Sequence, residues 1–394
     1  MHVLILSANT GGGHNSCAGA IKDVFDEQSI PCVMVDVLSF VSEKASDFIS
    51  RWHTRIYRYA PELFRTGYRF SENHPDVFQE NSRVFDFLTL GSERLGNYIK
   101  VHGFDTVVCV HVFSSLILTE TMKKQRLDIR SCFVATDYTC SPGVEDSNVD
   151  IYFIPDKSLT EDFTVGSITA DQIVASGIPV REMFFKRTDK PVAKRSVGVN
   201  ENSRHLLIMC GSMGCGPVWR ITDILSYMLP EGCEATVVCG TNERLYERLA
   251  ARYAGEKRIH VCGYVSDMSL LMDSADLYLT KPGGLSTSEA AVKRLPMVLI
   301  DAVAGCEEYN RDFFVRRGGA ETADTVEELA EMCCRLLEDE KALKKMADSL
   351  ARVMPENPAR KICACLETPG EPLKDIETER QTWKNRSSIT ENFA

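Results

Sequence analysis

The stretch from Lys281 to Asn310 reads KPGGLSTSEAAVKRLPMVLIDAVAGCEEYN, and it follows a short apolar, β-prone run from Leu277 to Thr280. That run predicts a buried strand. The Pro-Gly-Gly sequence at 282–284 then ends the strand and allows a tight backbone turn. Ser286 with Glu289 three residues later is the pattern of a capping box, which predicts a helix with Ser286 at its N-cap. The segment therefore begins as a strand, a glycine loop and a helix.

A second strand is expected after this helix. Pro296 is expected to end the helix, and Met297 to Ile300 has the composition of a strand. In such a unit, backbone N–H groups and the positive end of the helix dipole converge on the loop at Gly283 and Gly284. An anion such as a diphosphate is therefore the expected ligand. A glycine pair before a helix also occurs without a ligand, so the pattern alone leaves both interpretations open.

The chain opens with the same type of unit. Val3 to Ala8 predicts a strand, residues 11–14 (GGGH) a loop, and Asn15 to Gln28 a helix, and Cys32 to Asp36 predicts the next strand. This order predicts a parallel sheet covered by helices. The loop also matches part of a dinucleotide-binding fingerprint, but Ser16 stands at its third glycine, so a dehydrogenase is the less favoured interpretation.

A third unit of this type starts the second half of the chain. His205 to Cys210 predicts a strand, and residues 211–216 form a glycine-rich loop after it. The residues between the two halves are charged and carry no long apolar run, so they are predicted to be a linker. The expected organisation is an α/β domain at 1–182, a linker at 183–203, a second α/β domain at 204–356, a helix at 357–367 and a polar, mobile tail at 368–394.

Composition limits the class of protein. The chain has 394 residues, of which 44% are hydrophobic and 26% charged, enough to bury two ordinary cores. Its formal net charge of −11 argues against a general nucleic-acid or membrane binder. The fifteen cysteines include no C-x-x-C pair, which is typical of reduced thiols in a cytosolic protein. No signal peptide is expected, and no apolar run approaches the ~20 residues that span a bilayer, so any membrane contact is expected to be peripheral.

Between residues 40 and 70, aromatic and arginine side chains are interleaved. Arg51, Arg55 and Arg58 fall at helical spacing on one face, with Trp52 and Tyr59 beside them. Such a face can dock on anionic headgroups, with its aromatic rings at the membrane interface. A solvated helix whose aromatic rings join the core is the alternative.

The glycine loop and helix of the opening stretch resemble the nucleotide-sugar site of GT-B glycosyltransferases, specifically the group of monogalactosyldiacylglycerol synthases and bacterial processive diacylglycerol glucosyltransferases. Thr280 to Gly284, Ser288 to Ala290 and Pro296 match its TKPGG and SEA elements and the proline of its G-x-P element. The later loop departs, because Cys306 stands where the family has glutamine. The resemblance runs from residue 1 to about residue 360. It implies an α/β GT-B fold, with two doubly wound, Rossmann-like domains facing a central cleft and the last helix crossing back to the first domain.

The resemblance also implies roles for individual residues. The GGGH loop is similar to the family's N-terminal loop and makes His14 the candidate base, whereas a helix-start histidine bonded to the backbone is the structural alternative. Asp137 belongs to the family's Thr-Asp pair and would support the acceptor or orient the base. Glu289 corresponds to the glutamate that binds the ribose hydroxyls. The residues implied at the nucleotide-sugar site are Gly13, Gly211, Ser212, Met213, Gly214, Gly263, Tyr264, Val265, Lys281, Pro282, Gly283, Gly284, Ser286, Glu289, Glu307, Glu308 and Asn310.

The implied activity is that of an inverting hexosyltransferase with UDP-glucose or UDP-galactose as donor and diacylglycerol or a related lipid as acceptor. The aromatic and arginine stretch would then lie beside the acceptor site, which favours peripheral contact with an anionic membrane at its cytoplasmic face. No Asp-x-Asp triplet occurs in the chain, so no tightly held metal and no cofactor are expected. Transfer to a polyprenyl or polar acceptor, epimerisation of a UDP-sugar, and non-catalytic sensing of a UDP-sugar remain as alternatives.

Overall fold

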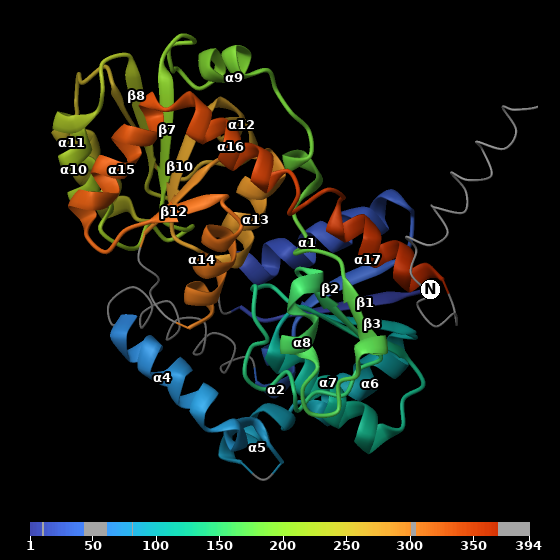
Figure 1. The fold of residues 1–394 in the computed structure, drawn as a ribbon. Coiled ribbons are helices and arrows are strands. Elements are labelled where there is room, and N and C mark those ends of the chain that lie inside the picture. The colour runs from blue at the N-terminus through green and yellow to red at the C-terminus, as the bar shows by residue number, and fades with distance from the viewer. Residues whose placement is uncertain (10–11, 43–60, 81, 301–304, 369–394) are drawn as a thin grey trace, which may run out of the picture.

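The structure is a computed structural model that describes residues 1–9, 12–42, 61–80, 82–300 and 305–368. These residues form two six-stranded parallel sheets with helices on their faces (Figure 1). The first sheet has the strand order β2-β1-β3-β4-β5-β6. Its strands are β1 (Val3–Ser7), β2 (Cys32–Asp36), β3 (Thr106–Cys109), β4 (Arg130–Val134), β5 (Ile151–Ile154) and β6 (Ile173–Ala175).

The second sheet has the order β12-β11-β10-β7-β8-β9. In both sheets the strand order reverses beside the first strand, between β1 and β3 and between β7 and β10. In open parallel sheets ligands bind at such switch points, at the carboxyl ends of the strands. The strands of the second sheet are β7 (Arg204–Met209), β8 (Cys233–Val238), β9 (Ile259–Cys262), β10 (Leu277–Thr280), β11 (Met297–Leu299) and β12 (Ala320–Thr322).

Helices cover both faces of each sheet because alternate strand residues point to opposite sides. Leu4 and Leu6 of β1 join one buried cluster, whereas Val3 and Ile5 join another. The helices of the first half are α1 (Gly12–Glu27), α2 (Leu38–Val41), α4 (Pro61–Asn73), α5 (Arg83–Thr89), α6 (Ser92–His102), α7 (Val112–Gln125) and α8 (Thr160–Phe163). Those that follow are α9 (Lys190–Ser196), α10 (Val218–Met228), α11 (Glu243–Arg252), α12 (Met268–Ser274), α13 (Gly284–Lys293), α14 (Cys306–Arg316), α15 (Val326–Glu338), α16 (Glu340–Leu350) and α17 (Pro358–Glu367).

The segment expected to link the domains contains α9, which packs on the second domain. Lys190 and Lys194 of α9 donate to the carboxylate of Asp276, at 2.8 and 2.9 Å. Lys194 is buried, so its ion pair takes the place of water around both charges. Helix α9 of the expected linker is therefore held on the second domain.

The last helix, α17, returns to the first domain. Ile362 and Cys363 are buried in the cluster that contains Val3, Ile5 and Ile21, and Figure 1 shows α17 beside α1. The two helices before it, α15 and α16, are separated at Asp339. There the Asp339 side chain accepts from the N–H of Ala342 and caps α16.

Two further expectations concern membranes. Arg51, Trp52, Arg55, Arg58 and Tyr59, which the sequence suggests for membrane or acceptor contact, lie outside the described residues. Within the described part of the chain, no helix combines the length and apolar character that a bilayer crossing requires.

Candidate active site

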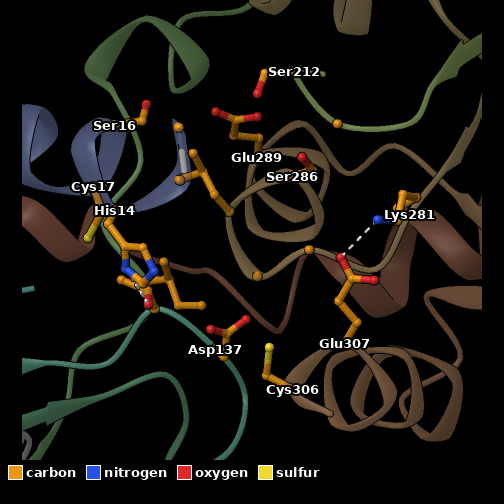
Figure 2. Close-up of a pocket in the computed structure, with 18 of the residues that line it drawn as sticks. His14, Ser16, Cys17, Asp137, Ser212, Lys281, Ser286, Glu289, Cys306 and Glu307 are labelled. Carbon is orange, nitrogen blue, oxygen red and sulfur yellow. Dashed lines mark hydrogen bonds and ion pairs between the residues drawn. The ribbon is translucent and has the colours of Figure 1, made fainter. Parts of the chain in front are cut away.

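A cavity of about 1020 Å³ lies between the two domains and is lined by both. Its walls are the segments that follow the carboxyl ends of β1, β4, β7 and β10, close to the switch point of each sheet. Figure 2 shows His14 on one side, Ser286 and Glu289 across from it, and Asp137 and Cys306 below. The cavity therefore brings side chains of the first domain opposite the glycine loop of the second.

His14 lies in the first turn of α1, with its ring held in one orientation. Its Nδ1 is 3.0 Å from the carbonyl oxygen of Val110 and 3.1 Å from the hydroxyl of Thr136. Because a carbonyl oxygen can only accept, Nδ1 carries the proton, and the lone pair of the neutral ring is on Nε2. The ring meets that of His111 edge-on, at a centroid distance of 4.6 Å. The contact of Nδ1 with the backbone is thus present, and the role of His14 as a base stays a prediction.

Asp137 follows β4 and lines the cavity from the first domain. Burial raises the pKa of its carboxyl to about 6, and the charge of Glu307 acts in the same direction. The Nδ2 group of Asn310, 2.7 Å away, opposes this shift by donating to Oδ1. Asp137 is therefore largely ionised at neutral pH, although it gains a proton more readily than an exposed aspartate.

Helix α13 begins earlier than the sequence predicts, and the capping-box prediction is wrong. Gly283 is the N-cap, and no side chain caps the helix. Ser286 lies within the first turn, so Glu289 is too far along the helix to reach back to the N-cap backbone. Its carboxyl instead points toward the cavity (Figure 2), and burial raises its pKa to about 8. The helix start thus presents backbone N–H groups to the cavity together with one protonatable carboxyl.

Gly284 is required by the close approach of the two domains. A Cβ at this position would lie 2.0 Å from the carbonyl oxygen of Thr136, which is shorter than any real contact. We expect Gly284→Ala to lower the free energy of unfolding by about 1–3 kcal/mol, because the backbone of one domain must move away from the other. Chemical denaturation would measure this change.

Gly283→Ser is the matched control for that substitution. No atom lies within 4 Å of a Cβ at Gly283, and its backbone is extended, as an N-cap serine requires. The control should therefore be as stable as the unsubstituted protein or slightly more stable. Equal stability of Gly284→Ala and Gly283→Ser would contradict the close approach.

Lys281 and Glu307 form an ion pair across the cavity wall. Their charged atoms are 3.3 Å apart, and both side chains are buried (Figure 2). Glu307, Glu308 and Asn310 are all expected at the nucleotide-sugar site, and of these three only Glu307 lines the cavity. Glu308 pairs with Arg69 of α4 at 3.3 Å, and Asn310 is fully buried, with its amide bonded to protein groups.

The glycine loop after β7 also reaches the cavity, and it interlocks with the loop after β8. A Cβ at Gly214 would lie 2.3 Å from the carbonyl oxygen of Cys239, and one at Gly240 would lie 2.1 Å from that of Ser212. Of the sequence-predicted residues, the cavity is lined by Gly13, His14, Asp137, Gly211, Ser212, Met213, Tyr264, Val265, Lys281, Gly283, Gly284, Ser286, Glu289 and Glu307. Those outside its lining are Gly214, Gly263, Pro282, Glu308 and Asn310.

One side of the cavity was not anticipated from the sequence. Tyr68 of α4, Phe78, Phe113 and Phe133 give it an apolar wall in the first domain. Tyr68 also packs against Gly305 of the second domain, where a Cβ would meet its ring at 2.1 Å. Only Tyr68 belongs to the aromatic stretch at 40–70, and the other three rings come from segments that the sequence did not connect with it.

No group of three or more histidine, cysteine, aspartate or glutamate side chains is placed to hold a metal ion among the residues that the structure describes.

Comparison with known proteins gives two family matches. The monogalactosyldiacylglycerol (MGDG) synthase family profile matches residues 14–180, and the glycosyltransferase family 28 C-terminal domain profile matches residues 205–360. A similar protein from Bacillus cereus, named processive diacylglycerol beta-glucosyltransferase, is 27% identical over 360 residues, which are 91% of this chain and 91% of the relative.

Two solved structures resemble the fold. Acinetobacter baumannii MurG superposes with a TM-score of 0.60 at 13% identity, over 93% of this chain and 99% of that one. The spinosyn rhamnosyltransferase SpnG, complexed with thymidine diphosphate, has a TM-score of 0.61 at 11% identity, over 93% and 100%. The two facing α/β domains are thus a GT-B fold, as the sequence implied.

Proposed function

The chain belongs to the glycosyltransferases in which an MGDG synthase domain precedes a family 28 C-terminal domain, and from this premise we propose that it transfers a hexose from a UDP-sugar to diacylglycerol. One observation carries the proposal for this chain. A single cavity is lined by an oriented histidine from the first domain and by a helix N-terminus with a carboxyl from the second. Base and anion site therefore face each other across a space of about 1020 Å³.

In the proposed reaction, Nε2 of His14 takes the proton of the acceptor hydroxyl while the oxygen attacks the anomeric carbon. The bond from that carbon to UDP breaks, and the sugar is released from the nucleotide with inverted configuration, as a β-glycoside. The Nδ1–H group of His14 keeps its bond to the Val110 carbonyl, so the ring does not turn when it becomes positive. The ionised carboxylate of Asp137, in the same cavity, favours that positive charge.

The second domain would bind the donor. Backbone N–H groups at the start of α13, together with the helix dipole, suit the diphosphate and the negative charge that UDP gains on leaving. Glu289 lies about one turn further along α13 and would accept hydrogen bonds from the ribose hydroxyls. Glu307, held by Lys281, is the remaining carboxylate proposed for the sugar hydroxyls.

The acceptor would enter over the apolar wall of the first domain. Helices α4 and α5 carry exposed apolar side chains and project together from one end of the first domain (Figure 1). These side chains are Leu63, Phe70, Val84 and Phe87, and Leu90 directly after α5 is exposed as well. We propose that this face makes peripheral contact with an anionic membrane, together with the arginines at 51, 55 and 58.

A transfer assay tests the proposed function. Purified protein would be mixed with vesicles that contain diacylglycerol and with labelled UDP-glucose, UDP-galactose or UDP-N-acetylglucosamine in separate reactions. We expect label in the lipid with one hexose donor, and glucose is favoured because the similar Bacillus cereus protein is named a glucosyltransferase. Anionic vesicles should support faster transfer than neutral vesicles of equal diacylglycerol content.

The same assay can contradict the proposal. Binding of UDP without label in the lipid would exclude diacylglycerol as acceptor. A released, altered UDP-sugar would identify an epimerase instead.

A further inference from the structure

Two residues of the first domain, Asp137 and Tyr138, are packed into the second. Tyr138 is only 2% exposed. Its ring stacks on Phe313 at 4.2 Å and meets Phe314 edge-on at 4.9 Å, and its hydroxyl is 2.9 Å from that of Ser288. The segment after β4 therefore inserts a side chain between α13 and α14.

Asn310 of α14 joins this inserted segment to the glycine loop. Its Oδ1 accepts from the N–H of Tyr138 at 2.6 Å. Its Nδ2 donates to Oδ1 of Asp137 at 2.7 Å and to the carbonyl oxygen of Pro282 at 3.0 Å. Because an amide has one oxygen and two N–H groups, all three are used, and the donor and acceptor partners leave one orientation for the amide. Asn310 is 0% exposed, so no water competes for these bonds.

The surroundings of Asp137 come largely from the second domain. Its carboxylate accepts a hydrogen bond from Asn310, and the backbone N–H of Gly284 and the thiol of Cys306 also lower its pKa; all three groups belong to that domain. Other titratable groups near it are Glu307 on α14, Cys17 on α1 and Tyr68 on α4. A separation of the domains would remove the three donors together, while Asp137 would remain on the first domain.

We propose that Asn310 is a positioning residue that orients the Asp137 carboxylate across the domain interface, so that the acceptor-side catalytic group is complete only when the donor-binding domain is docked. The proposal rests on the proposed function for the role of Asp137. The family resemblance implied that Asn310 binds the nucleotide-sugar. In the structure its amide is instead bonded to protein groups, and Asn310 does not line the cavity.

The pH profile of transfer tests this role. The hydrogen bond from Asn310 favours the ionised form of Asp137, so its loss should raise the pKa of that carboxyl above about 6. In Asn310→Ala, we expect kcat/KM to fall about 10- to 100-fold and its acidic limb to move to higher pH by about one unit. Asn310→Ser, whose hydroxyl is too short to reach Asp137, should behave alike and serves if the alanine variant does not fold.

Arg317→Ala is the matched control. Arg317 also connects the two domains, because its guanidinium donates to the carboxylate of Asp156 at 2.6 Å. The guanidinium lies 4.5 Å from the ring centroid of Phe313, and neither of these two contacts involves Asp137. Its loss should weaken docking without moving the acidic limb. An unshifted limb in Asn310→Ala, or an equal shift in Arg317→Ala, would overturn the proposal.

A double-mutant cycle separates failure of this inference from failure of the proposed function. The unfolding equilibrium constant would be measured for Asn310→Ala, Asp137→Asn, the double variant and the unsubstituted protein at pH 7.5. A coupling of about tenfold or more is expected from a buried, charge-assisted bond, and no transfer activity is needed to see it. Additive effects would reject the Asn310 contact, whereas coupling without any transfer in the unsubstituted protein would reject only the proposed function.

Discussion

Substitution of His14 by alanine should lower kcat by about 10²–10⁴-fold while the dissociation constant for UDP changes less than about threefold. The large effect is expected because the substitution removes the group proposed to take the proton of the acceptor hydroxyl. The small effect is expected because the groups proposed to bind UDP lie on the second domain, whereas His14 lies on α1 of the first. Steady-state transfer and calorimetric binding of UDP measure the two quantities.

His14→Asn distinguishes a base from a positioning group. The amide nitrogen of asparagine is attached to Cγ, as Nδ1 of His14 is, and can still donate to the Val110 carbonyl, which Nδ1 approaches at 3.0 Å, but it cannot take up a proton near neutral pH. If His14 is the base, the asparagine variant should lose as much turnover as the alanine variant. Recovery of most of the activity in His14→Asn would instead assign it a positioning role, and loss of UDP affinity in both would contradict the separation of the two sites.

Glu289→Gln should weaken UDP binding by about 10- to 100-fold, the expected size of a lost pair of hydrogen bonds to a charged acceptor. Glutamine has nearly the same shape, so the substitution removes the charge and one acceptor without opening a cavity. Glu289→Ala should weaken binding at least as much. Affinity of Glu289→Gln within about twofold of the unsubstituted protein would remove Glu289 from the ribose site.

The pH dependence of UDP binding gives a second measure of Glu289. Burial raises the pKa of its carboxyl to about 8 in the open cavity, so most of the protein carries the proton at pH 7. Ribose hydroxyls donate to the ionised form, and binding must therefore release a proton. Affinity should then rise with pH up to about 8 and fall by as much as tenfold for each unit below it. Calorimetry in two buffers of different ionisation enthalpy would detect the proton, and Glu289→Gln should remove this part of the pH dependence while the titration of UDP itself remains.

The sequence by itself determined the local units of this protein. The β10 strand, the glycine loop after it and the existence of a helix there, α13, follow from an apolar run, turn residues and a helical pattern, which depend only on neighbouring residues. The same holds for β1 and α1, which place His14 after a strand. The resemblance of these units to a known family supplied the GT-B fold and named Asp137 and Glu289 as site residues.

The local sequence pattern gave a wrong prediction where a side chain had more than one possible partner. Ser286 and Glu289 have the spacing of a capping box, yet Gly283 starts the helix and Glu289 turns to the cavity. Glu308 and Asn310 lie within three positions of Glu307, so the sequence alone could not assign different roles to these three residues. The helix α14 directs Glu307 into the cavity, Glu308 toward α4 and Asn310 into the domain interface.

Only the tertiary structure decided which residues of the two domains meet. Asn310 and Asp137 are 173 positions apart, and Ser288 and Tyr138 are 150 apart. Contacts between the domains depend on how the two sheets pack against each other. Hydrophobic periodicity and turn residues do not predict this packing. Because Gly284 has no Cβ, the two domains can approach each other closely at this position. The chain therefore encodes its strands, loops and helices locally, whereas its proposed active site exists only through contacts between the two domains.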